Sequence, residues 1–354
     1  MIRSLFHLLL FFVIPTIFAC ATAPKIPMRQ DPLIDKIIHT ATRDPIPFNT
    51  LIAKIADFDV IYLSEKHDNP MHHAIQNRII QRLVKQEKSP ILGFEFFSMA
   101  DTPLLLNFSD SGKAPHSPKM ETAIEGQIRR QLNWDSQSDT MWAHYYDLLK
   151  LARDNHLLIS GLDLSSSQKR RIIRKGLEGL TPIEKKLIFS SQFSNKPYEA
   201  YMKSLFESVH CGMVHAKMTS RLYDTWMARN DKMALSISQL YESQSYETKL
   251  YRKGVGGPIV VIIGGGHTEY GLGVMDRVRA INPDISQVNI GLTEITRDPS
   301  DLGEYMQPLE LEGFEPVLSA NYLWFTQRVS YKDPCEEFKA AFDQMKQNQM
   351  KQKE

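Results

Sequence analysis

Continuous runs of apolar residues recur along the chain and predict the strands of a buried sheet. Four of them are Val60–Leu63, Ile91–Phe94, Leu157–Leu162 and Ile259–Ile263, and Ser286–Ile290 is a weaker fifth. Runs without polar alternation are typical of parallel strands that are covered on both faces. The pattern therefore predicts an α/β fold with a mostly parallel central sheet and helices on both faces.

A helical pattern joins the first two predicted strands. Within residues 74–85, Ile75, Ile79 and Leu83 share one face of a helix. Strand, helix and strand follow one another within about 35 residues, which is the length of a βαβ unit. We therefore expect these two strands to run parallel.

Two stretches are longer than a normal crossover between strands. Residues 100–155 are rich in aromatic side chains with helix-like surroundings, and residues 181–257 begin with Thr181, Pro182 and Glu184, the pattern of a capping box. We expect both to be helical insertions over the carboxyl ends of the strands. Their aromatic and methionine side chains are more often core than ligand pocket.

The first twenty residues predict a targeting signal. Arg3 precedes an apolar run that is too short to span a bilayer comfortably. The run ends in Ile17-Phe18-Ala19-Cys20, which resembles the lipobox of bacterial lipoproteins, so we expect residues 1–20 to be a lipoprotein signal peptide with Cys20 lipidated. Ala21 favours sorting to the outer membrane, facing the periplasm. An ordinary secretory signal is the alternative.

Composition divides the remainder of the chain. Residues 21–45 contain Pro24, Pro27 and Pro32 and are predicted to be a tether. Residues 46–338 hold all the predicted strands and form one α/β domain. Residues 339–354 are rich in Lys and Gln and are predicted to be a flexible tail.

The charge balance argues against a nucleic-acid partner. The 354 residues include 42 Lys and Arg and 41 Asp and Glu, so the chain is nearly neutral. A protein that binds nucleic acid needs a basic surface.

Export changes the interpretation of the other two cysteines. With Cys20 lipidated, Cys211 and Cys335 remain as a pair in an oxidising compartment. We expect a disulfide between them, and two buried free thiols are the alternative. In the chain-entropy model, closing so long a loop contributes on the order of 4 kcal/mol.

Polar side chains follow four of the predicted strands. Glu65 and His67 follow the first, Glu95 ends the second, Asp163 ends the third, and His267 follows the fourth after three glycines. Ligands of parallel sheets bind outside the carboxyl ends of the strands. We therefore expect these groups to form a site at one edge of the sheet. The alternative is that they satisfy one another and cap helices, without any chemistry.

The stretch after the first strand is dense in acids and imidazoles. We expect Glu65 and His67 to point into the site, and Asn69 to cap a helix that begins at Pro70. His72 and His73 would then be exposed, one turn into the helix.

Five motifs follow one another along the chain. They are Leu63-Ser-Glu-Lys-His-Asp-Asn-Pro-Met-His-His, Gly93-Phe-Glu-Phe-Phe, Tyr223-Asp-Thr-Trp-Met-Ala, Gly264-Gly-Gly-His-Thr-Glu-Tyr-Gly-Leu-Gly, and Tyr322-Leu-Trp-Phe-Thr followed by Asp333-Pro-Cys335. In this order they resemble the ChaN family of haem-binding lipoproteins, in the Tiki superfamily. Ser64 stands where that family usually has glycine, and Asp163 stands where asparagine is expected.

The resemblance implies a protein that binds haem and takes part in haem or iron uptake. It also implies a pocket that can lie at a homodimer interface, with a tyrosine on the iron, and phenolate is a hard oxygen donor suited to ferric iron. Tyr270 is the first choice because it follows His267 by three residues. Tyr223 and Tyr145 are alternatives, and His67 and His267 are further candidates for haem contacts. His67, His72 and His73 either serve the haem propionates or face water.

The same superfamily includes hydrolases, the erythromycin esterases and the Tiki peptidases. This second resemblance implies His67 as general base, with Glu65, Glu95 and His267 around it. A version with a divalent metal would use His67, Glu95 and His267 as ligands. A hydrolase is therefore the alternative to a haem carrier, and the sequence leaves open whether the protein is an enzyme.

Overall fold

The computed structural model describes residues 31–110, 117–191, 193–251, 256–296 and 301–333, with the pairs 335–336, 339–340 and 343–344. The predicted signal peptide, its lipidation site at Cys20, the first part of the tether and most of the tail lie outside the described residues. Within the part of the chain that is described, no helix combines the length and the apolar character needed to cross a bilayer.

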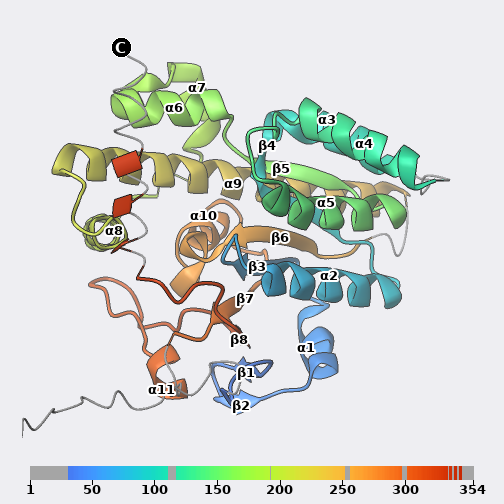
Figure 1. Ribbon diagram of the computed structural model, residues 1–354, viewed down its shortest axis with the longest axis horizontal. Coiled ribbons are helices and arrows are strands. Elements are labelled where there is room, and N and C mark those ends of the chain that lie inside the picture. Colours follow the sequence, from blue (N-terminus) through green and yellow to red (C-terminus); the bar gives the residue numbers. More distant parts are fainter. Residues whose placement is uncertain are drawn as a thin grey trace, which may run out of the picture.

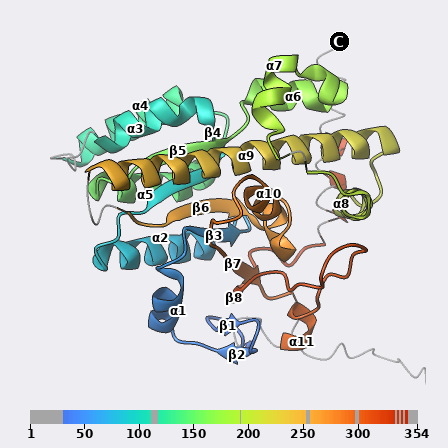
Figure 2. The same ribbon diagram turned by 180° about the vertical axis from the view of Figure 1, so that it is seen from behind.

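The described residues form a central sheet of eight strands (Figures 1 and 2). The strands are β1 (Ile37–His39), β2 (Asp44–Pro45), β3 (Val60–Glu65), β4 (Ile91–Ser98), β5 (Ile159–Asp163), β6 (Ile259–Gly264), β7 (Gln287–Glu294) and β8 (Tyr322–Thr326). Their order is β2-β1-β8-β7-β3-β6-β4-β5. The six strands from β8 to β5 in this order pair in parallel, and β1 pairs antiparallel with β2 and β8. The predicted α/β fold with a mostly parallel sheet is confirmed.

The first two strands fall inside the segment that was predicted to be a tether. Ile37 and Ile38 are buried on opposite sides of β1, and both pack in the core. Strands of three and two residues are too short to show a periodic pattern in a sequence, and the prolines favoured a tether. This part of the segment belongs to the sheet instead.

Eleven α-helices occur among the described residues. They are α1 (Phe48–Ile55), α2 (Pro70–Lys85), α3 (Thr102–Asp110), α4 (Pro118–Gln131), α5 (Asp139–Asp154), α6 (Ser166–Lys175), α7 (Pro182–Ile188), α8 (Lys196–Val209), α9 (Ala216–Tyr251), α10 (Val274–Ile281) and α11 (Leu302–Tyr305). The expected caps at Asn69 and Thr181 are present, each followed by proline at the first helical position.

Different helices cover the two faces of the sheet, because successive strand residues point to opposite sides. Ile61 and Leu63 of β3 pack in a core shared with α1, α2 and α5. Val60 and Tyr62 face the other side, against α9 and α10. Both faces are therefore covered and excluded from water, which explains why the strands are continuous apolar runs in the sequence.

The second predicted insertion contains the long helix α9, which has two roles. Met233 and Ile237, in the middle of the helix, pack on the face of the sheet. Its N-terminal half reaches the carboxyl ends of the strands, where Arg229 contacts Glu95 in β4. Figure 1 shows α6, α7 and α8 gathered around this N-terminal half.

Cys211 and Cys335 are bonded through their sulfur atoms, with their Cα atoms 5.6 Å apart. This separation lies in the range of about 4.4–6.8 Å that disulfides occupy. The bond joins the turn after α8 to the segment beyond β8. Oxidation of the two thiols in the exported protein stays a prediction, and counting free thiols in the unreduced protein tests it.

Candidate functional site

The carboxyl ends of four neighbouring strands gather the side chains that were predicted to form a site. Glu65 ends β3, Glu95 lies in β4, Asp163 ends β5, and His267 ends the 3₁₀ turn η4 (Gly265–His267) after β6. Because β3, β6, β4 and β5 are consecutive in the sheet, these side chains meet at one edge. We call the following residues the edge cluster: Glu65, His67, Glu95, Asp163, Arg229 and His267.

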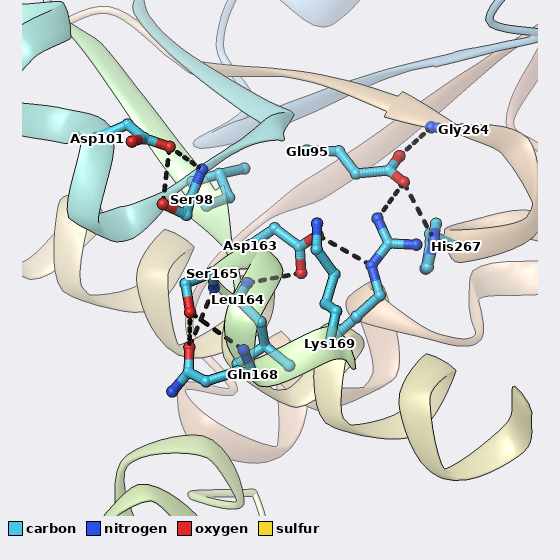
Figure 3. Close-up of polar contacts among 12 residues, drawn as sticks. Glu95, Ser98, Asp101, Asp163, Leu164, Ser165, Gln168, Lys169, Gly264 and His267 are labelled. Atoms are coloured by element: carbon cyan, nitrogen blue, oxygen red, sulfur yellow. Dashed lines mark hydrogen bonds and ion pairs between the residues drawn. The ribbon is translucent and has the colours of Figure 1, made fainter. Parts of the chain in front are cut away.

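Glu95 is buried at the centre of the edge cluster. One oxygen accepts a hydrogen bond of 2.6 Å from Gly264 N–H, and the other lies 2.6 Å from Arg229 Nη2 and 3.3 Å from His267 Nε2 (Figure 3). Burial raises the pKa of this carboxyl, but the positive charges of His267 and Arg229 outweigh burial and hold the pKa well below its usual range. Glu95 is therefore a fixed anion.

Arg229 joins two strands and was missed from the sequence. Its Nε donates to Asp163 Oδ2 at 2.9 Å, while Nη2 donates to Glu95. Lys169 Nζ also lies 2.8 Å from Asp163 Oδ2 (Figure 3). Two buried carboxylates at one sheet edge require a cation, and that requirement was the available signal. Asp163 therefore sits in an ion-pair network.

His267 is held on both sides of its ring. Nδ1 lies 2.7 Å from Asn230 Oδ1 in α9, and Nε2 faces Glu95. Within the described residues, no group of three or more His, Cys, Asp or Glu side chains is placed to hold a metal ion. The guanidinium of Arg229 lies against Glu95, which was one of the three predicted ligands of a divalent metal.

Glu65 is saturated by donors from the protein. Its Oε1 accepts hydrogen bonds from Tyr145 Oη–H and from His67 Nδ1, the latter at 3.1 Å. Its Oε2 accepts from Gln76 Nε2 at 2.5 Å and lies 3.4 Å from His73 Nδ1. The carboxylate therefore orients the rings and amide around it and offers little to a ligand.

His67 is the most accessible imidazole of the edge cluster, with 39% of its side chain exposed. Its ring packs edge-on against the ring of Phe96, with the ring centroids 4.5 Å apart. Its Nε2 has no hydrogen-bond partner within the described part of the chain. Burial lowers the pKa of His67, but the hydrogen bond to Glu65 and the charge of Glu95 outweigh burial and raise it. The ring also lies over Gly264, where an added Cβ would be 2.6 Å from His67 Cε1.

His72 and His73 are both buried, so the prediction that they are exposed is wrong. His72 Nδ1 accepts a hydrogen bond of 2.8 Å from Lys66 N–H, and Nε2 lies 3.0 Å from Thr326 Oγ1 in β8. Burial lowers the pKa of His72 to about 3, so the ring is neutral. His73 stacks on His144 of α5, with ring centroids 4.7 Å apart. The two rings fasten the start of α2 to its neighbours.

The three candidate tyrosines occupy different surroundings. Tyr145 is fully buried and donates to Glu65, and burial together with that carboxylate raises the pKa of its phenol. Tyr223 is packed against Trp226, with ring centroids 6.0 Å apart, and burial raises its pKa to about 12. Tyr270 is half-buried, in the 3₁₀ turn η5 (Glu269–Gly271), and lines a cavity.

This cavity, which we call the Tyr270 cavity, lies between α10, η5 and the segment from Leu309 to Asn321. Its volume is about 560 Å³, within the range of about 300–1,000 Å³ typical of small-molecule pockets. Leu272, Met275 and Phe314 form part of its apolar lining, and Asp276 and Arg279 from α10 are charged groups on its wall.

The backbone holds Tyr270 in an unusual conformation. Its φ is 60°, in the left-handed region that side chains other than glycine rarely adopt. Its N–H donates to Ser319 O at 3.0 Å, so the cavity wall fixes the turn. Strained residues of this kind cluster at functional sites.

Ser64, at the position where the resemblance led us to expect glycine, connects the end of β3 to the wall of the Tyr270 cavity. Its hydroxyl donates to Asn289 Oδ1 and lies 2.6 Å from Thr268 Oγ1. Asn289 in turn lines the Tyr270 cavity. The departure therefore adds hydrogen bonds between the end of β3 and the cavity wall.

A family model described as haem-binding uptake, Tiki superfamily, ChaN matches residues 51–278. No curated protein matches the chain.

Three solved structures are similar to this one. The ChaN protein of Campylobacter jejuni, which binds haem cofacially, has a TM-score of 0.54 and 15% identity, with 81% of this chain and 95% of that chain covered. The type III effector HopBA1 has a TM-score of 0.38 and 11% identity, with 79% and 92% covered. A mutant of the erythromycin esterase EreC in its open conformation has a TM-score of 0.37 and 12% identity, with 77% and 79% covered. The first of these likenesses shows a common fold.

Proposed function

Because the chain belongs to the ChaN family of haem-binding uptake proteins, in the Tiki superfamily, we propose that it binds haem in the Tyr270 cavity. The proposal includes a role in haem or iron uptake at the bacterial cell envelope, with a lipid anchor at Cys20 in the outer membrane. It also includes pairing of two haem-loaded copies, since the C. jejuni relative binds haem cofacially.

One observation carries the haem proposal: a half-buried tyrosine lies on the wall of an apolar cavity that also holds an arginine. A porphyrin needs apolar walls for its ring, a cation for its propionates and an axial ligand for its iron. Leu272 and Phe314 supply apolar wall, and Tyr270 supplies a phenol. A Cβ on Gly271 would lie 4.0 Å from Arg279 Nη2, so this guanidinium lies beside the turn that carries Tyr270.

The other predicted ligands fit less well. Both ring nitrogens of His267 already face oxygen atoms. The Tyr145 phenol is committed to Glu65, and Tyr223 is buried against Trp226. His67 has a free Nε2 but lies in the edge cluster, apart from the residues that line the cavity.

Titration of the purified protein with hemin tests the proposal. We expect a saturable shift of the Soret band, and a different spectrum with at least tenfold weaker binding in Tyr270→Phe. Tyr223→Phe is the matched control and should behave like the wild type. Absence of saturable binding by the wild type overturns the haem proposal, whereas an unchanged Tyr270→Phe spectrum overturns only the ligand. Loss of palmitate labelling in Cys20→Ala tests the anchor.

Hydrolysis at the edge cluster is the second candidate. It is favoured by His67, whose side chain is 39% exposed and whose Nδ1 is held by Glu65, an arrangement that general bases use. Against it, the raised pKa of His67 favours the charged ring, which cannot accept a proton.

Ester and peptide hydrolysis by the wild type and by His67→Ala, with and without divalent metal, discriminates the two functions. We expect no turnover in either protein. Turnover by the wild type that falls about 10²–10⁴-fold in a folded His67→Ala variant would establish a hydrolase.

A further inference from the structure

Asp276 is a buried residue on the wall of the Tyr270 cavity, and only one of its two carboxylate oxygens has a hydrogen-bond donor in the described part of the protein. The residue is 7% exposed and lines the cavity from α10. Oδ1 lies 3.0 Å from Arg277 Nη1, whereas Oδ2 has no hydrogen-bond partner among the described residues. Oδ2 is itself enclosed by protein atoms, although other atoms of the residue line the cavity. A buried oxygen without a partner is costly, so a turn of the carboxyl group toward a ligand in the cavity recovers part of that cost.

The neighbouring cation does not fully compensate this carboxylate. Arg277 shares its guanidinium with Asp231, whose Oδ2 lies 3.0 Å from Nε, and with Gly273 O at 2.8 Å. The same guanidinium lies 4.7 Å from the centre of the Phe193 ring. One arginine thus serves two buried carboxylates.

The other groups around Asp276 come from several elements. Tyr62 of β3 and Tyr198 of α8 are neutral phenols that interact with its charge, and Arg279 of α10 opposes it. Burial raises the pKa of Asp276 to about 6, against the lowering effect of Arg277. The protonated form is therefore present in mildly acidic solution.

Resting on the proposed haem function, we propose that the protonated carboxyl group of Asp276 turns toward the cavity and donates a hydrogen bond to a haem propionate whose charge is balanced by Arg279. Both side chains lie on the wall of one cavity and belong to one face of α10, three residues apart. The pair would form a subsite for the propionate that orients the porphyrin, while Tyr270 would supply the phenol for the iron.

This subsite couples ligand binding to a proton. A propionate beside Asp276 favours its protonated form, so above about pH 6 the complex holds a proton that the free protein has lost. Asp276 therefore weakens hemin binding as the pH rises above 6, by up to about tenfold per pH unit. Below pH 6 the group is protonated in both states and contributes no pH dependence.

The decisive measurement is the ratio of hemin affinities of Asp276→Asn and the wild type between pH 5 and 8. The amide donates a hydrogen bond at every pH, and the ratio cancels the titration of Tyr270 and of hemin itself. We expect the ratio to be constant below pH 6 and to rise by up to about tenfold per unit above it. Asp284→Asn, an exposed residue near the end of α10, is the matched control and should give a flat ratio.

Hemin dimethyl ester separates the propionate from the rest of the porphyrin. Its carboxyl groups are esterified, so the Asp276→Asn ratio should stay flat for this ligand at every pH. A flat ratio with hemin, while both proteins bind it saturably, overturns the subsite and leaves haem binding intact. Failure of the wild type to bind hemin removes the subsite and the proposed function together.

Discussion

In the edge cluster, the carboxylates of Glu65, Glu95 and Asp163 each meet at least two donors from the protein. In the Tyr270 cavity, one oxygen of Asp276 meets no donor within the described residues. Both regions combine buried charge with aromatic walls, and they are joined through Ser64 and Asn289. They differ in whether the protein itself completes the hydrogen bonds.

This difference distinguishes a framework, in which the protein completes its own hydrogen bonds, from a cavity wall that, among the described residues, still lacks a donor. Groups that satisfy one another stabilise a unique arrangement and gain little from a ligand. A cavity with apolar walls and an unsatisfied polar atom gains from a ligand that fills it. Five polar residues after four strands predicted a site at the edge cluster, and the proposed haem site lies in the neighbouring cavity that Tyr270 lines.

The largest effect is expected from removing the cation of the edge cluster. Arg229→Gln leaves Glu95 and Asp163 without their shared guanidinium, and should lower the free energy of unfolding by about 3–5 kcal/mol, as for other broken buried pairs. Urea unfolding measures it. Arg171→Gln, at the more exposed pair with Glu184, is the control and should change stability little. An Arg229→Gln protein as stable as the wild type would contradict the view of the cluster as a framework.

The opposite change in stability is expected when the buried carboxylate on the cavity wall is replaced by an amide. Asp276 has its pKa raised from 3.8 to about 6 in the folded protein, so its stability penalty is absent below pH 3.8 and complete above about pH 6. Asp276→Asn should therefore raise the free energy of unfolding at pH 7, by about 3 kcal/mol at most, and the gain should vanish near pH 4. Urea unfolding at both pH values checks this, with Asp284→Asn as control. A loss of stability at pH 7 would place Asp276 with the framework instead.

A smaller effect is expected from crowding His67. In Gly264→Ala the new Cβ would lie 2.6 Å from His67 Cε1 and 2.9 Å from Nε2, so the ring must move from Glu65. We expect a cost of about 1–3 kcal/mol, as for other overpacked sites, with hemin binding retained. Gly266→Ala, where no atom lies within 4 Å of an added Cβ, is the matched control. Equal thermal unfolding of the two variants would refute the close contact.

Much of the sheet could be predicted because a strand that is buried on both faces is a continuous apolar run in the sequence. β3, β4, β5 and β6 are continuous apolar runs, and the polar residues at their ends follow from chain order and parallel pairing. The strands of two and three residues near the N-terminus are too short to form such a run.

The site was less predictable because its contacts are distant in sequence. His72 is buried through Thr326 of β8, and Arg229 reaches Glu95 across 134 positions. Asp276 looks like an ordinary acidic residue in the first turn of a helix, where it is favourable. Only the fold reveals that one of its oxygens has been left without a donor.

The bond between Cys211 and Cys335 closes a covalent ring that contains α9, β6, α10, β7 and β8. Apart from Thr40 and Ala41, every residue that lines the Tyr270 cavity falls inside this ring. A protease that cuts the chain once within the ring therefore releases no fragment, and the cavity walls stay tethered to the body of the protein. After a single cut, reduction of the disulfide is needed to free the two pieces of the ring from their covalent link, so the cavity has a tolerance to single nicks that the strands before Cys211 lack.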